Sequence, residues 1–73
     1  MSSPLSRMIA GARGIVSEIR STAARIDKLA ALGILPGVEV RVQQNRPVVV
    51  VELGETVLAI ELELAEGIVV SVL

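Results

Sequence analysis

The sequence predicts a mainly β protein with short helices, folded as one small, strongly bent β-barrel. Three observations lead to this prediction. The 73 residues are enough for a single domain, here residues 1–73. Apolar and polar residues alternate over several short segments in the second half of the chain, which is typical of strands with one buried face. Turn signals separate these segments, and many short strands joined by tight turns favour a small barrel.

The first part of the chain mixes helix and strand signals. Ser3 followed by Pro4 is typical of a helix start, with Pro4 at the first helical position, and only a turn or two can follow before Gly11. Residues 14–19 (GIVSEI) form a strand candidate whose imperfect alternation is consistent with a β-bulge. A helix is then expected over residues 22–32, with Ser21 as the N-cap and with the apolar spacing of one buried face.

The segment LAALGILPG contains two chain-reversal signals. Gly33 stands where a helix ends on a left-handed residue, and this placement makes Leu29 and Ile34 the two side chains that touch in a Schellman motif. Pro36 and Gly37 then occupy the central positions of a type II turn. The segment therefore predicts a helix end followed at once by a tight turn into a strand.

From this turn onward the hydrophobic period is two. Strands are expected over residues 38–43, 48–53, 56–61 and 68–72, with one helical or 3₁₀ turn within residues 61–67. The Gly54-Glu55 pair is typical of a two-residue hairpin loop, which sets the register of the strands beside it. In that register Val51 faces Leu58 on the inner side of the sheet, and Val50 faces Ala59 on the outer side.

Composition argues against several classes of function. The chain has no Cys and no His, so neither a disulfide nor a zinc, copper or iron site is expected, and no cofactor is predicted. Its serines have no base beside them, so no enzyme is predicted. The net charge is -1 and no aromatic residue is available to stack on bases, so no nucleic-acid partner is expected.

The same reasoning favours a cytoplasmic protein. No uncharged run approaches the roughly 18 residues that a membrane-spanning helix needs, so no direct membrane insertion is expected. Arg7 and Arg13 fall where a signal peptide would need an apolar stretch.

The outer face of the expected hairpin carries an apolar stripe with a glutamate at each end, Glu52 and Glu61. We call this set the outer stripe; its members are Val48, Val50, Val57 and Ala59. Two interpretations stay open. Either the helix at 22–32 or the N-terminal segment packs over the stripe, or the stripe is a surface for docking or self-association.

Three further residues complete the set of candidate partner-binding residues. Ile34 and Pro36 lie at the corner between helix and strand, and Arg46 lies at the tip of the loop over residues 44–47. An arginine at a loop tip is able to act on a GTPase in trans, although a solvated turn arginine is the simpler interpretation.

Two segments resemble the FeoA family, KLAALGILPGVEVRV (28–42) and RPVVVVELGETVLAIELELAEGIVV (46–70). The most specific part is LGILPG, and Ala65, Ile68 and Val70 match the family's Ala-x-x-Ile-x-Val ending. The resemblance implies an SH3-like β-barrel. It also implies a small cytoplasmic accessory protein of ferrous iron transport, a protein-interaction module for the membrane GTP-binding transporter FeoB, with transition metal ion binding as a property of the family.

The resemblance further implies recruitment to the inner face of the cytoplasmic membrane, and it leaves two alternatives. The same module resembles the C-terminal domain of DtxR-type metalloregulators, so a stand-alone domain that binds a regulator is the first alternative. The second is a weak homo-oligomer that forms through the outer stripe or through an exposed edge of the barrel.

Overall fold

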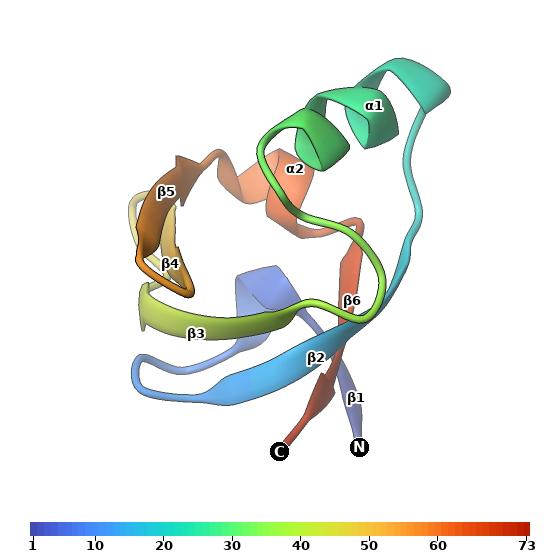
Figure 1. Ribbon diagram of the computed structural model, residues 1–73. Helices are drawn as coiled ribbons and strands as arrows, with labels where there is room; N and C mark the ends of the chain where they lie inside the picture. The colour runs from blue at the N-terminus through green and yellow to red at the C-terminus, as the bar shows by residue number, and fades with distance from the viewer.

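Six antiparallel strands form one curled sheet in the spatial order β1-β6-β2-β3-β4-β5. The computed structural model describes residues 1–73, and Figure 1 shows the sheet bending around the interior of the molecule. The strands are β1 (Ser2–Pro4), β2 (Arg13–Ile19), β3 (Glu39–Gln44), β4 (Val49–Leu53), β5 (Thr56–Ile60) and β6 (Ile68–Val72). The helices are the 3₁₀ turn η1 (Leu5–Arg7), α1 (Ala23–Ala31) and α2 (Leu62–Ala65). The mainly β fold with short helices is therefore confirmed.

The sheet does not close into a barrel, which corrects the expectation from the sequence. Strand β1 pairs with β6 and strand β5 pairs with β4, so β1 and β5 are the two edges of the sheet. A closed barrel would need hydrogen bonds between these two edge strands. Strand β1 contains only three residues before the chain turns into η1, and its pairing is with β6.

The N-terminal residues form a strand where the sequence predicts a helix start. Ser2 lies opposite Ser71, and Pro4 lies opposite Val69. The helical signal appears one step later, in η1, which begins after Pro4 and has no side-chain cap. Pairing with β6 outweighs the local preference, and proline is tolerated because β1 is an edge strand.

Helix α1 begins one residue later than predicted. Its N-cap is Thr22 rather than Ser21, and the Thr22 hydroxyl accepts a hydrogen bond of 3.2 Å from the backbone N–H of Arg25. Both residue types are good caps. The buried face of α1 centres on Leu29, which is fully buried, whereas Ala23 at its start is exposed.

The end of α1 is the predicted Schellman motif. The backbone N–H of Ile34 donates to the carbonyl of Leu29 at 2.9 Å, and that of Gly33 donates to the carbonyl of Ala30 at 2.9 Å. Gly33 has a φ of 96°, which only glycine adopts without cost. Leu29 and Ile34 are both fully buried, so the motif also fastens α1 to the core.

The type II turn after the helix is confirmed as well. Gly37 has a φ of 94°, and the backbone N–H of Val38 donates to the carbonyl of Leu35 at 3.2 Å. The turn is held against β2, because the N–H of Gly37 donates to the carbonyl of Val16 at 2.7 Å. This contact sets the direction in which the chain enters β3.

The core is built from aliphatic side chains on the inner face of the sheet and on the helices. Its fully buried larger members are Leu5, Leu29, Ile34, Ile68, Val16, Val40, Val42, Val49, Val51 and Val70. Strands β2 and β6 approach closely at Gly14, where a Cβ atom would lie 2.6 Å from the carbonyl oxygen of Ser71. Farther along the same pair, the register shifts between Val16 and Glu18, which confirms the predicted bulge.

Candidate partner-binding surface

The hairpin of β4 and β5 has the register that its two-residue loop predicts. Leu53 pairs with Thr56, and Val50 pairs with Ala59. Gly54, the first residue of the loop, has a φ of 59°, whereas Glu55 after it does not have a positive φ. A type II′ loop requires this combination. Strand β4 begins at Val49, so Val48 lies in the loop before the strand instead of pairing with Glu61.

Part of the outer stripe is open to solvent. Val57 is 55% exposed and Ala59 is also exposed, whereas Val48 and Val50 are half-buried. Neither expected cover lies over the two β5 residues. Helix α1 sits beside α2, where Arg25 forms an ion pair of 3.3 Å with Glu63, and the N-terminal strand pairs with β6 (Figure 1).

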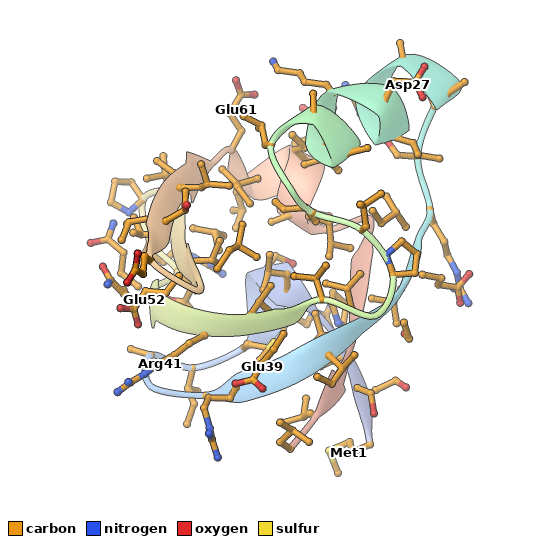
Figure 2. The ribbon with its side chains drawn as sticks, viewed as in Figure 1. Met1, Asp27, Glu39, Arg41, Glu52 and Glu61 are labelled. Atoms are coloured by element: carbon orange, nitrogen blue, oxygen red, sulfur yellow. The ribbon has the colours of Figure 1, made fainter.

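Carboxylates lie at the two ends of the outer stripe. Figure 2 shows Glu52 and Glu61 at the two ends of the hairpin. The Glu52 carboxylate lies 3.7 Å from Nε of Arg41 on the neighbouring strand, whereas Glu55 and Glu61 make no ion pair. From residue 47 onward the chain has five glutamates and no Lys or Arg. The hairpin therefore presents apolar side chains between glutamates at its two ends.

The other predicted residues do not join this surface. Ile34 is fully buried in the core, which corrects its prediction as a surface contact. The Schellman motif explains the burial, because its second hydrophobic residue packs back onto the helix. Pro36 is exposed, but its turn is bonded to β2, and β3 separates β2 from β4 in the sheet.

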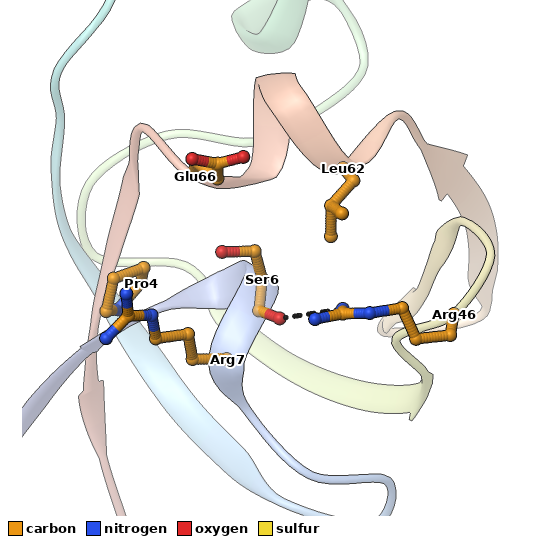
Figure 3. A pocket seen from close by; sticks show the side chains of 6 residues that line it. All are labelled: Pro4, Ser6, Arg7, Arg46, Leu62 and Glu66. Carbon is orange, nitrogen blue, oxygen red and sulfur yellow. Dashed lines mark hydrogen bonds between the residues drawn. The ribbon is translucent and has the colours of Figure 1, made fainter.

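Arg46 lies over a separate cleft, shown in Figure 3. Its guanidinium donates through Nη1 to the carbonyl of Asn45 at 2.6 Å and to that of Ser6 at 3.4 Å. The side chain thus links the β3–β4 loop to η1 instead of projecting freely from the loop tip. The cleft is lined by Pro4, Ser6, Arg7, Arg46, Leu62 and Glu66. Sequence reasoning missed this cleft because its lining comes from three segments that are far apart in the chain.

One surface ion pair shifts the pKa values of its two groups. Arg20 donates through Nη2 to the Glu18 carboxylate at 2.9 Å. This hydrogen bond and the attraction between the charges lower the pKa of Glu18 and raise that of Arg20. Both groups are solvent-exposed. No group of three or more acidic side chains gathers where it could hold a metal ion, and neither helix has the length and apolar character needed to cross a bilayer.

Comparison with known proteins identifies relatives over nearly the whole chain. The family model of the FeoA domain matches residues 3–72. Among solved structures, an iron uptake regulatory protein (FeoA) has 32% identity and a TM-score of 0.93, with 100% of each chain covered. The chain is also similar to FeoA of Stenotrophomonas maltophilia, with 27% identity, a TM-score of 0.79, and 92% of this chain and 86% of the other covered. That protein, complexed with zinc, is described as a prokaryotic SH3 domain protein and a candidate activating factor of ferrous iron transport.

The fold also occurs as one part of longer proteins. IdeR of T. acidophilum has 21% identity and a TM-score of 0.90, and the match covers 97% of this chain but 34% of that one. At this identity the likeness concerns the fold alone. No curated protein matches the chain in sequence.

Proposed function

This chain belongs to the FeoA family, and we propose that it serves ferrous iron transport as a protein-interaction module whose partner is a membrane GTP-binding transporter of the FeoB type. It acts on the cytoplasmic side and reaches the inner face of the membrane by binding that partner. No cofactor and no catalytic step enter this proposal.

The observation that carries the proposal is the outer stripe. Its exposed β5 residues are apolar, and carboxylates stand at both ends. An apolar patch with a polar rim is typical of a protein interface, because burial of the patch drives association while the rim sets orientation.

The test is to place a charge in the middle of the outer stripe. Val50→Glu should abolish binding to the cytoplasmic GTP-binding domain of the transporter, measured by isothermal titration with the purified domain. Val50 is half-buried on the outer face, and the core residues of β4 lie on the other face, so the circular dichroism spectrum should stay that of the folded protein.

Gln43→Glu is the matched control, because it adds the same charge at an exposed position of β3 outside the stripe. This variant should bind like the unmodified protein. If Val50→Glu also binds normally, the stripe is not the docking surface. If instead its spectrum collapses, the stripe is part of the core.

A second candidate is supported by the fold shared with IdeR, in which this domain is one part of a longer chain. In this candidate the protein acts as a detached metalloregulator-type domain and binds a regulator. Co-purification with a DNA-binding repressor rather than with a GTP-binding transporter would favour it. Light scattering addresses the remaining alternative, weak self-association, through a particle size that grows with concentration.

A further inference from the structure

We propose that the free edge of β5 accepts an extended partner segment as a seventh strand of the sheet. The segment carries Lys or Arg near both ends and small or β-branched apolar residues between them. This inference rests on the proposed function in taking the chain to be an interaction module, and it adds the mode of binding and the chemistry of the bound segment.

The backbone of β5 offers unpaired hydrogen-bonding groups along this edge. Leu53 and Thr56 flank a two-residue loop and therefore form a hydrogen-bonded pair. Hydrogen-bonded and non-hydrogen-bonded pairs alternate along antiparallel strands, so the next bonded pairs involve Leu58 and Ile60. Val57 and Ala59 direct their N–H and C=O groups to the open side, and no turn, loop or cap hydrogen bond uses those groups.

Nothing in β5 protects this edge. Sheet edges are usually shielded by proline, by charged side chains, by a bulge or by a very short strand. Strand β5 has five residues, TVLAI, none of them proline or charged, and its pairing with β4 is regular throughout. The opposite edge, β1, has three residues and ends in Pro4. The β5 edge is therefore the one available for strand addition.

The side chains beside the edge specify the chemistry of the added strand. By the alternation of the strand, Val57 and Ala59 share the outer side, and the exposed Glu55 and Glu61 flank β5 at its two ends. A new strand places its own side chains about 5 Å from these, in cross-strand pairs. Apolar residues then meet Val57 and Ala59, and cations meet the two glutamates, neither of which has an ion pair in this structure.

The same row of side chains disfavours a second copy of this chain as the occupant. Two copies would pair their β5 strands antiparallel, and the register that uses all the free backbone groups places Leu58 opposite Leu58 of the other copy. In this register Glu55 of each copy lies directly opposite Glu61 of the other, so the dimer contains two pairs of like charges. Like charges opposite each other destabilise paired strands, whereas a segment with basic ends forms favourable pairs at both positions.

The direct test uses two synthetic peptides, acetyl-KTVTVTK-amide and its charge-reversed control acetyl-ETVTVTE-amide. The basic peptide should bind at least about tenfold more tightly at low salt, because it forms two ion pairs where the control creates two repulsions. On binding, amide hydrogen exchange measured by NMR should slow at Val57 and Ala59 and stay unchanged in β1. Absence of binding at about 1 mM peptide, equal affinity for both peptides, or protection elsewhere would each overturn the proposal.

Variants distinguish binding at the β5 edge from binding elsewhere on the outer face of the sheet. Glu55→Lys combined with Glu61→Lys should reverse the preference between the two peptides, and both positions are exposed, so folding is retained. Ala59→Pro should lose binding, because it removes an outward N–H while leaving the bonds to β4. Should the proline variant fail to fold, the charge reversal still decides the question.

Gln43→Glu should change peptide affinity by less than about threefold, because Gln43 is exposed on β3, and β4 separates β3 from the edge strand β5. A large loss in this variant would place the peptide away from the β5 edge and overturn strand addition. A doubling of particle size without peptide, together with slow amide exchange at Val57 and Ala59, would also overturn it, because a second copy would then occupy the edge. If the protein binds the peptide but not the transporter domain, only the proposed function is rejected. If it binds the transporter domain but not the peptide, only strand addition is rejected.

Discussion

Replacing Gly33 tests whether the corner between α1 and β3 depends on a left-handed backbone. Gly33 has a φ of 96°, and a Cβ atom added there would meet no atom within 4 Å. The cost of Gly33→Ala is therefore one of backbone torsion and not of packing. Holding an L-residue in the left-handed region costs about 1–2 kcal/mol. Alanine has less conformational freedom than glycine in the unfolded chain, so it loses less entropy on folding, and this offsets about 0.4–1 kcal/mol of the cost. The expected net loss is about 1 kcal/mol, which lowers Tm by roughly 4–8 °C in a domain of this size.

The mirror-image residue, D-alanine, should stabilise the fold relative to glycine instead of destabilising it. D-alanine prefers positive φ, so Gly33→D-Ala, introduced by chemical synthesis, keeps the entropic gain of about 0.4–1 kcal/mol without the torsional cost. Thermal and urea unfolding followed by circular dichroism should therefore rank D-Ala above glycine and glycine above L-Ala. Equal stability of the L-Ala and glycine proteins, or equal losses for both alanines, would refute the reasoning.

Other positions give effects of different origin. Leu29→Ala should destabilise the fold by about 2–5 kcal/mol in urea unfolding, because it leaves a cavity where a fully buried side chain fastens α1 to the core. Gly14→Ala should cost about 1–3 kcal/mol by the same measurement, because its Cβ would lie 2.6 Å from the carbonyl oxygen of Ser71. Arg20→Ala should raise the pKa of Glu18 toward its ordinary value in an NMR titration. Because folding lowers this pKa, the pair stabilises the folded state above the unfolded pKa, and that stabilisation is lost as pH falls through the folded pKa.

The controls use neighbouring positions. Leu32→Ala removes the same side chain at the end of α1, where Leu32 is 44% exposed, and should change stability by less than about 0.5 kcal/mol. A loss as large as that of Leu29→Ala would contradict the burial argument. An unchanged Glu18 pKa in the Arg20 variant would show that the ion pair does not form in solution.

The elements predicted correctly are those that local geometry decides. The Gly54-Glu55 loop allows one register, so the pairing of Val51 with Leu58 follows from the sequence. Gly33 likewise defines the end of α1, because few other residues take its conformation. The sequence predicts the N-cap one position too early, at Ser21 instead of Thr22, because both residue types are suitable caps and the direction of the backbone chooses between them.

The errors concern contacts between residues far apart in the chain. Strand β1 exists because Ser2 lies opposite Ser71, and no local signal at the N-terminus reports that pairing. The open sheet has the same origin, because alternation identifies strands without saying which of them remain at the edges.

The candidate site was predictable on one strand pair only. Alternation placed Val57 and Ala59 on the outer face, and their exposure agrees with that placement. The prediction of Ile34 as a surface contact is wrong, because the Schellman motif packs this side chain inward. The prediction of Arg46 at a free loop tip misses its contact with Ser6, because this contact joins segments that are 40 residues apart.

Both ends of the described chain leave the molecule at one place. The backbone N–H of Val72 donates to the carbonyl of Met1 at 2.8 Å, and Figure 1 shows the two ends, at β1 and β6, near each other at the bottom of the view, away from β5. A covalent tether at either end would therefore start from the same spot and need not cross the hairpin. Fusion of this domain to another polypeptide would therefore leave the β4–β5 hairpin accessible.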